Sequence, residues 1–157
     1  MKLNSLSGRN LLALAIAMFA LAAQAGDSTY GKVTSIKSLE VVVLDCGEDK
    51  YNVRLIGIET PEDKGIAKLG KQMMSKLILK KRVQMRFEYR NEQEEMVGRI
   101  LMIDDPQKGT VDLGEQLVKA GLAKKEADYD YKCGCLAKAE KEAQENNRGI
   151  WAKKGGK

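Results

Sequence analysis

The chain of 157 residues contains no histidine, only three cysteines and no long apolar run after its first 25 residues. Without imidazole, hydrolytic mechanisms that use histidine as a base, acid or metal ligand are excluded, and so are serine hydrolases with a Ser-His-Asp triad. Three cysteines without histidine cannot complete a tetrahedral zinc shell, so we do not expect a zinc site. Any hydrolysis must therefore depend on carboxylates, arginines and a hard cation.

The first 25 residues have the pattern of a secretory signal peptide. Lys2 and Arg9 precede the apolar run 11–23, and Ala23-Gln24-Ala25 fits the small-x-small cleavage rule. The run is shorter than the roughly 20 residues that span a bilayer, which disfavours the alternative of a membrane anchor. We expect a secreted or periplasmic protein with no stable membrane association after cleavage. Loss of the two basic residues would lower the formal net charge from +5 to +3.

The rest of the sequence shows no repeat, low-complexity tract or linker, so we expect one domain at 26–152 and a disordered basic tail at 153–157. The protein is expected to be a monomer. The basic clusters 80–82, 124–125 and 153–154 are interpreted as solvated surface, because acidic residues lie between them. In an oxidising compartment we expect a disulfide between Cys46 and either Cys133 or Cys135, and the third thiol would be free or would link two chains.

Hydrophobic periodicity predicts an α+β fold in which strands come first and helices later. Residues 30–35, 40–46 and 50–58 read as a strand meander, residues 65–81 as an amphipathic helix, and residues 83–89 and 98–103 as a hairpin with its tip at 91–95. Asp112 is expected to cap a helix that stops at Gly121, and a charged helix at 136–147 is expected to end at Gly149. Five strands with one helix after the third indicate an OB-type barrel with about three helices.

Charged residues interrupt two apolar strands of this prediction. The segment Val53–Glu62 carries Arg54, Glu59 and Glu62 around a Thr-Pro turn, and Arg99 leads the apolar run 100–103. Two guanidinium groups and paired carboxylates suit a phosphodiester, with carboxylates for a metal and a base and arginines for the phosphate charge. The alternative is an ion pair between these arginines and Glu59 or Glu62, or a helix N-terminal charge in the case of Glu62. A bulge at Gly57 would bring Glu59 to the face of Arg54.

These segments resemble the staphylococcal nuclease (thermonuclease) family, whose hallmarks are V-R-L-x-G-I-D-T-P-E, a later Y-G-R and a terminal G-L/I-W. The matching stretches here are V-R-L-I-G-I-E-T-P-E, V-G-R and R-G-I-W, in the same order. The resemblance extends from about residue 31 to residue 151. It implies that Arg54 and Arg99 bind the phosphate and that Glu62 orients or deprotonates the attacking water. It also places Tyr129 and Tyr131 in the nucleotide pocket, although ordinary packing explains both tyrosines equally well.

The resemblance further implies a calcium site whose ligands are altered. Family members carry D-G-D-T at the second strand; its second aspartate binds calcium with the aspartate and the threonine carbonyl of D-T-P-E. Counting back from Arg54 assigns these positions to Glu40, Glu59 and Thr60. Each glutamate adds a methylene, about 1.5 Å, in a site where calcium requires oxygens at about 2.3 to 2.6 Å. We therefore expect a divalent cation, with Ca²⁺ first and Mg²⁺ or Mn²⁺ as alternatives, and Asp45 as a substitute ligand if the register differs.

The sequence as a whole predicts an exported, metal-dependent nuclease that hydrolyses phosphodiester bonds of DNA, with RNA as a second candidate substrate. The main alternative is an OB module that binds nucleic acid or another partner without turnover. A weaker alternative is a secreted inhibitor or scaffold, because fold does not fix function.

Overall fold

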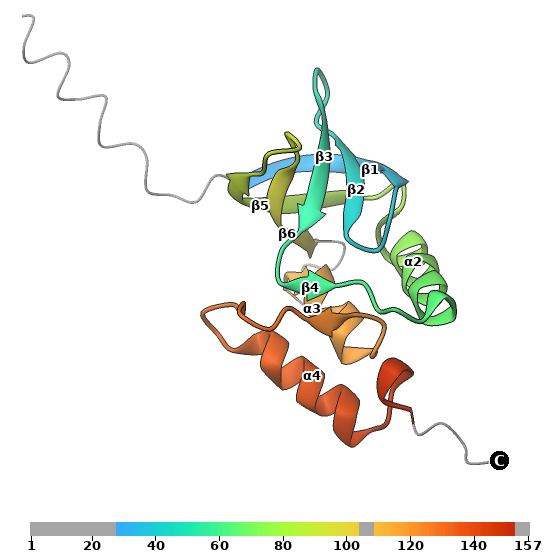
Figure 1. The fold of residues 1–157 in the computed structure, drawn as a ribbon. Helices are drawn as coiled ribbons and strands as arrows, with labels where there is room; N and C mark the ends of the chain where they lie inside the picture. The colour runs from blue at the N-terminus through green and yellow to red at the C-terminus, as the bar shows by residue number, and fades with distance from the viewer. Residues whose placement is uncertain (1–27, 104–108, 153–157) are drawn as a thin grey trace, which may run out of the picture.

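The computed structural model of the protein describes residues 28–103 and 109–152. The expected signal peptide at 1–25 and the basic tail at 153–157 lie outside the described residues. Within them, no helix has the length and apolar character needed to cross a membrane. The elements follow the order of a strand-rich first half and a helical second half (Figure 1).

Five strands form a closed barrel. They are β1 (Ser28–Ile36), β2 (Val41–Asp45), β3 (Lys50–Leu55), β5 (Arg82–Arg90) and β6 (Met96–Met102). Neighbouring strands pair in the order β3-β2-β1-β5-β6, and a parallel pairing of β3 with β6 closes the circle. The short strand β7 (Val111–Asp112) continues the sheet beyond β6. The predicted α+β fold with a five-stranded OB-type barrel is thus confirmed.

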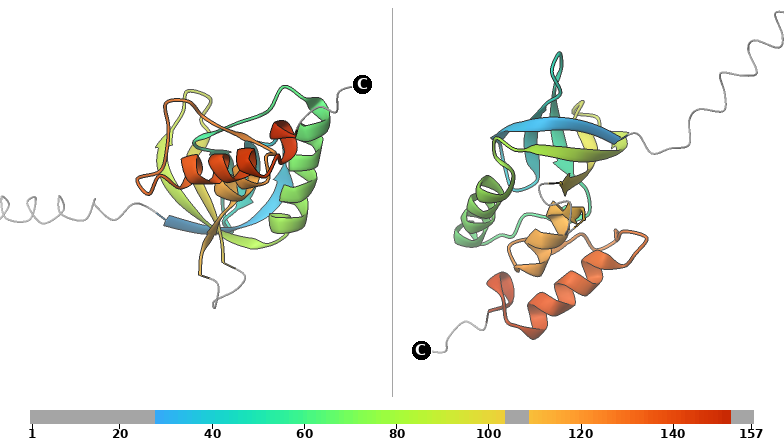
Figure 2. Two further views of the ribbon diagram at one scale, coloured as in Figure 1. Left: turned by 90° about the horizontal axis from the view of Figure 1, so that it is seen from below. Right: turned by 180° about the vertical axis from the view of Figure 1, so that it is seen from behind.

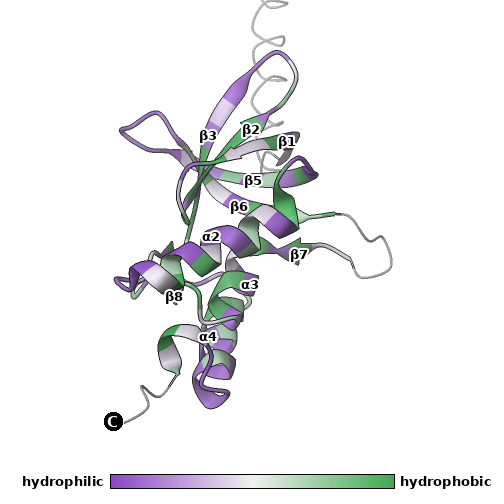
Figure 3. Ribbon diagram, turned by 90° about the vertical axis from the view of Figure 1, so that its right-hand side faces the viewer, coloured by the Kyte–Doolittle hydropathy of each residue, from purple (hydrophilic) through white to green (hydrophobic). Residues whose placement is uncertain are grey.

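Three helices complete the fold: α2 (Lys64–Ile78), α3 (Leu113–Lys119) and α4 (Cys135–Glu145). Helix α2 runs beside the barrel, whereas α3 and α4 lie at one end of it (Figure 2). Apolar and polar residues alternate around α2 (Figure 3), as its sequence period predicts. The predicted Asp112 cap is confirmed, because its Oδ1 accepts from the Glu115 N–H at 2.9 Å.

The last helix ends earlier than predicted. Helix α4 stops at Glu145, and Asn147 takes the left-handed conformation, with φ of 51°. Gly149 instead begins the short 3-10 helix η1 (Gly149–Trp151). An asparagine can fill the left-handed position expected of glycine because its short polar side chain tolerates that conformation.

One core fills the barrel and continues to the helices. The inward positions of β1 and β2, including Val33 and Leu44, are fully buried, as are Met74 and Ile78 of α2 and Leu136 of α4. The helices bury their apolar faces in this one core, because each helix has a single apolar face with which to pack. The barrel and the helical end therefore form one packed unit around the residues considered below.

The third predicted strand is interrupted at Gly57. Strand β3 ends at Leu55, and the chain resumes as β4 (Ile58–Glu59), which pairs with β8 (Lys124–Lys125) in a separate two-stranded sheet. Gly57 has φ of +80°, and a Cβ there would lie 2.5 Å from the Tyr129 ring. In place of the expected bulge there is a complete strand break. The backbone between Arg54 and Glu59 is therefore irregular, as a bulge would also have made it.

The predicted cysteine pairing is wrong. Cys133 and Cys135 form the disulfide, and Cys46 is free and partly buried. The reason is position: Cys46 follows β2 at the hairpin end of the barrel, whereas Cys133 and Cys135 lie at the start of α4 at the opposite end (Figure 1). Burial, followed by the charges of Asp45 and Asp49, raises the pKa of the Cys46 thiol.

Candidate active site

Arg54 lies near the end of β3 and is held by two carboxylates. Its Nε donates to Glu95 Oε2 at 2.7 Å, and its NH1 donates to Glu40 Oε2 at 2.7 Å. The arginine is therefore paired, as one of the two alternatives predicted. Its partners are not Glu59 or Glu62, however, because Glu40 precedes the neighbouring strand β2 and Glu95 precedes β6, both of which pair with β3.

Glu40 connects the barrel to the Thr60-Pro61 turn. Its Oε1 accepts from the Thr60 N–H at 2.7 Å and from Thr60 Oγ1 at 2.6 Å. The start of β2 is fixed in turn by Ser38, whose Oγ accepts from the Glu40 and Val41 N–H groups at 3.2 and 3.0 Å. Glu40 and Thr60, two of the three expected metal ligands, are thus in direct contact.

Glu95 completes the Arg54 network from the hairpin between β5 and β6. The Asn91 side-chain amide donates to Glu95 Oε2 at 2.9 Å, and Asn91 Oδ1 accepts from the Glu95 N–H at 2.9 Å. The side-chain hydrogen bond from Asn91, with that from Arg54 as the second favourable contribution, holds the pKa of Glu95 below its usual value despite the opposing effect of burial. The carboxylate is therefore kept charged beside Arg54.

A pocket of about 240 Å³ opens beside this network. Its walls carry the charged side chains of Glu40, Arg54, Glu59 and Glu126 and the ring of Tyr89, which is 52% exposed. The structure thus brings Arg54, Glu40 and Glu59 to one pocket, whereas Arg99 and Glu62 do not line it. Glu59 is exposed there, while its backbone pairs with Lys124 of β8.

Arg99 belongs to a second network that points toward α3. Its Nε donates to Asp112 Oδ2 at 2.9 Å, and its guanidinium carbon lies 3.8 Å from the centroid of the Tyr131 ring. The Tyr131 hydroxyl donates to Asp112 Oδ1 at 3.1 Å. Burial would lower the pKa of Arg99, but the hydrogen bond and charge of Asp112 outweigh it and the pKa is raised. Arg99 is therefore a fixed cation that does not line the Arg54 pocket.

The two tyrosines differ in exposure. Tyr131 is buried, and burial followed by the charge of Asp112 raises its pKa strongly. Tyr129 is partly buried, contacts Tyr131 edge to face at 6.0 Å between ring centroids, and covers Gly57. Tyr131 thus contributes packing and a hydrogen bond to Asp112, while Tyr129 lies nearer the strand break that leads to Glu59.

Glu62 lies outside the Arg54 pocket. It lines a separate groove of about 620 Å³ together with Pro61, Lys124 and Ile150. The helix-capping alternative applies to its neighbour, since Asp63 Oδ1 accepts from the Gly65 and Ile66 N–H groups at 2.8 and 3.1 Å. Glu62 itself is exposed and makes no hydrogen bond or ion pair with any residue that the structure describes.

The expected cation can be tested against these donors. Glu40, Glu59 and the Thr60 carbonyl offer only oxygen atoms, which suits Ca²⁺, Mg²⁺ or Mn²⁺. Among residues 28–103 and 109–152, however, no three carboxylate, histidine or cysteine side chains are close enough to hold an ion. Both Glu40 oxygens already accept hydrogen bonds. The donor chemistry therefore fits a hard cation. Only two carboxylates, those of Glu40 and Glu59, would hold it, and Glu40 would have to give up at least one of its present hydrogen bonds.

Sequence reasoning missed four residues of this site. Asp112 was recognised only as a helix cap, and Glu95 only as part of a polar hairpin tip; Tyr89 and Glu126 carried no motif. The signal that could have revealed Glu95 is the arginine itself, because an arginine in an apolar strand requires a carboxylate on a neighbouring strand.

The comparisons with known proteins agree with the observed fold. A family model described as staphylococcal nuclease homologue matches residues 52–153 of the 157-residue chain. No curated protein sequence matches the chain. The matched region covers more than half of the chain and includes Arg54, Glu59, Glu62 and Arg99 together with the barrel closure and all three helices. The chain therefore belongs to the staphylococcal nuclease homologue family.

Proposed function

We propose that the protein is an exported, metal-dependent nuclease that cleaves phosphodiester bonds of DNA, with RNA as a second substrate. The observation that carries the proposal is the pocket in which the Arg54 guanidinium lies with the carboxylates of Glu40 and Glu59. Family membership supports nuclease-type chemistry, and the absence of histidine leaves carboxylates and arginines to perform it.

Arg54 binds the phosphate in this proposal. Its side chain is 37% exposed, so a phosphate can reach it from the pocket and share the guanidinium with Glu40 and Glu95. Guanidinium donors match two phosphate oxygens at once and stabilise the charge that develops during attack. The hydrogen bonds that Arg54 donates to Glu95 and Glu40 fix its orientation before the substrate arrives.

Glu40, Glu59 and the Thr60 carbonyl would hold the cation. A divalent cation there would neutralise phosphate charge and polarise the scissile phosphorus–oxygen bond. The contact of Glu40 with the Thr60 N–H and hydroxyl positions the turn that carries these ligands. Glu59 is exposed beside them and free of side-chain partners in the described part of the chain.

Glu62 would serve as the general base from the loop after Thr60. A base must have an accessible carboxylate with no stronger internal partner, and Glu62 meets both conditions. Glu62 lines the neighbouring groove and not the Arg54 pocket, so its carboxylate would act on a water between the two. Arg99 is held by Asp112 and Tyr131, and it would touch the phosphate only after leaving Asp112.

The experiment is cleavage of end-labelled single-stranded DNA by the purified protein with Ca²⁺, Mg²⁺, Mn²⁺ or EDTA. We expect cleavage with at least one cation, no cleavage in EDTA, and loss of cleavage in Arg54→Ala and in Glu62→Gln. The matched controls are Lys68→Ala and Glu92→Gln, which change exposed residues away from the pocket. RNA of the same sequence, tested in parallel, measures the second substrate.

The alternative function is nucleic-acid binding without turnover. It is favoured by one observation, that both Glu40 oxygens are occupied by hydrogen bonds where the family has a calcium-binding aspartate. A folded protein that binds DNA and cleaves it with none of the three cations would establish this alternative. Secretory export is tested separately by following the size and location of the expressed chain.

A further inference from the structure

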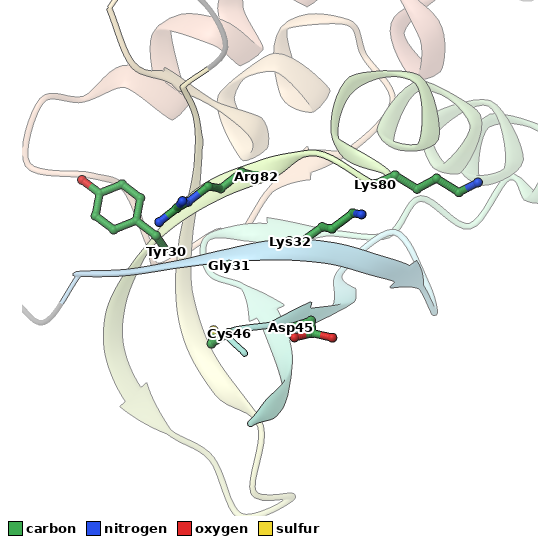
Figure 4. Close-up of a pocket in the computed structure, with 7 residues that line it drawn as sticks. All are labelled: Tyr30, Gly31, Lys32, Asp45, Cys46, Lys80 and Arg82. Carbon is green, nitrogen blue, oxygen red and sulfur yellow. The ribbon is translucent and has the colours of Figure 1, made fainter. Parts of the chain in front are cut away.

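A second pocket, of about 410 Å³, lies on the barrel away from Arg54 (Figure 4). It is formed by the middle of β1, the end of β2 and the start of β5. Its lining consists of Tyr30, Gly31, Lys32, Asp45, Cys46, Lys80 and Arg82. We call it the β1–β5 pocket. Sequence reasoning interpreted its basic cluster 80–82 as ordinary solvated surface.

Three cations line the β1–β5 pocket, and one carboxylate, Asp45, lies among them as the partner of Lys32 in the β1–β2 ladder. Lys32 stands directly opposite Arg82 in the antiparallel ladder of β1 and β5. Like charges in this position destabilise a sheet, because the two side chains share one face at close range. Neither residue, nor Lys80, forms an ion pair with any residue of 28–103 or 109–152. The one carboxylate of the lining, Asp45, contacts Lys50 instead at 3.7 Å.

Lys80 is held in a conformation that favours glycine. Its φ is 64°. The backbone N–H of Lys80 donates to the Val33 carbonyl at 2.8 Å, and this hydrogen bond fixes the backbone in that conformation. The carbonyl oxygen of Lys81 accepts from the Val33 N–H at 3.0 Å, so two backbone hydrogen bonds join β1 to this turn. A lysine in the left-handed region is strained relative to glycine, and such strain is commonly found where a side chain has a role.

An exposed aromatic ring completes the pocket. Tyr30 is 47% exposed, and the guanidinium carbon of Arg82 lies 5.7 Å from its ring centroid. Figure 4 shows Tyr30 and Arg82 beside each other, with Lys32 and Lys80 extending along the same side of β1. Basic side chains beside a ring that can stack on a base are the combination used by proteins that bind single-stranded nucleic acid.

We propose that the β1–β5 pocket binds the backbone of a single-stranded nucleic acid, with phosphates at Lys32, Lys80 and Arg82 and a base stacked on Tyr30. The inference rests on the proposed function in one respect, the choice of nucleic acid as the class of ligand. Glu40 and Cys46 lie at opposite ends of β2, six residues apart at about 3.3 Å each, so the two pockets are roughly 20 Å apart. One strand of several nucleotides can therefore contact both pockets.

An anionic membrane is a less suitable partner. Membrane-surface binding combines basic residues with apolar side chains that enter the lipid. The exposed large hydrophobic residues of the described chain are Tyr30, Leu69 and Tyr89, and only Tyr30 lines this pocket. The pocket therefore offers charge and one ring, without an apolar surface to insert.

The test measures binding of a labelled single-stranded oligonucleotide of about 12 residues by fluorescence anisotropy, in EDTA, over a range of salt concentrations. The pocket variant is Lys80→Gly with Arg82→Gln. Its control is Lys68→Gln with Lys76→Gln, which removes two exposed, unpaired lysines from α2. Loss of two phosphate contacts should reduce the slope of log affinity against log salt by about 1.4, and the control should keep the wild-type slope.

A third variant, Tyr30→Ala, tests the stacking contact. We expect its affinity to fall about tenfold for the normal oligonucleotide and to stay unchanged for an abasic strand, because only stacking is lost. The proposal is overturned if the pocket and control variants change the slope equally. It is also overturned if the pocket variant loses binding only to vesicles that contain phosphatidylserine, which would identify a membrane site. Cleavage is measured separately from binding. If the wild-type protein never cleaves DNA but the pocket variant loses oligonucleotide binding, the proposed nuclease activity is refuted and the proposed binding pocket is supported.

Discussion

The two charged regions of the barrel differ in how their cations are balanced. In the Arg54 pocket, one guanidinium meets two carboxylates at 2.7 Å, and Arg99 behind it meets the buried Asp112 at 2.9 Å. In the β1–β5 pocket, Lys32 stands opposite Arg82 in one ladder and opposite Asp45 in the other. Asp45 contacts Lys50, and the three cations of the pocket form no ion pair within the described residues. One region is a network of internal ion pairs, while the other is a surface with an excess of positive charge.

This difference separates two tasks that are usually assigned to one cleft. A neutralised pocket attracts a polyanion weakly from a distance, but its side chains are already oriented for chemistry. A surface with excess positive charge attracts a polyanion strongly, but the β1–β5 pocket has a single carboxylate, Asp45, and so lacks the paired carboxylates expected to hold a cation. We therefore assign turnover to the Arg54 pocket and binding of the nucleic-acid strand to the β1–β5 pocket.

The largest effect is expected at Asp112. Asp112→Ala leaves the Arg99 charge without its partner, removes a hydrogen bond from Tyr131 and deletes the α3 cap, so the free energy of unfolding should fall by about 3 to 5 kcal/mol. Urea denaturation measures it. The matched change in the other region, Asp45→Ala, should cost about 1 kcal/mol or less, because its ion pair with Lys50 is exposed. Equal losses in the two variants would contradict the contrast.

Arg54→Lys should affect turnover much more than folding. A lysine keeps the charge beside Glu40 and Glu95 but cannot present two parallel donors to a phosphate. We expect the cleavage rate to fall about 100-fold, with a change of about 1 kcal/mol or less in unfolding free energy. Arg90→Lys, a change at the exposed ion pair of Arg90 with Glu94, is the control for both measurements. A variant with the wild-type rate would show that Arg54 is only structural.

The Arg54 network should also depend on acid. The pKa of Glu95 is lowered in the folded state, so its stabilising contribution is fully present above the unfolded value of about 4.3 and is lost as the pH falls through the folded value. Glu95→Gln should therefore lower the melting temperature at about pH 6, and its difference from wild type should narrow as the pH falls below about 4. Glu92→Gln at the exposed hairpin tip should show no such dependence. A constant difference across this range would contradict the assignment.

The smallest effect has the opposite sign and lies in the β1–β5 pocket. Lys80→Gly relieves left-handed strain and should raise the free energy of unfolding by up to about 1 kcal/mol. Lys76→Gly in α2 is the contrasting control and should lower it by about 1 kcal/mol, because glycine destabilises a helix. Destabilisation by Lys80→Gly would show that the lysine serves the fold and not a ligand.

The sequence predicted the barrel because each element carries its own local signal. Strand alternation, the 3.6-residue period of residues 64–78 and the Asp112 cap all depend on residues close together in the chain. The strand break at Gly57 was expected only as a bulge, because whether a chain rejoins the same sheet depends on a distant partner, here β8.

The candidate site was predictable only in part. Arg54, Glu40 and Glu59 line one pocket, but Glu62 lies in another groove. The carboxylate that completes the Arg54 network, Glu95, is distant in sequence and became visible only through the pairing of β3 with β6.

The disulfide was misassigned for the same reason, since cysteine pairing depends on which ends of the barrel the residues occupy. The placement of Lys32 opposite Arg82 also requires the strand register.

The most direct test of the division is to measure cleavage and binding together in wild type, in Arg54→Lys, and in Lys80→Gly with Arg82→Gln. Cleavage would be followed with the most active cation at saturating single-stranded DNA, and binding in EDTA at fixed salt. The account predicts that Arg54→Lys loses turnover and keeps its affinity, while the pocket variant loses affinity and keeps its turnover. Two variants that lose the same quantity, or a pocket variant that loses neither, would contradict it.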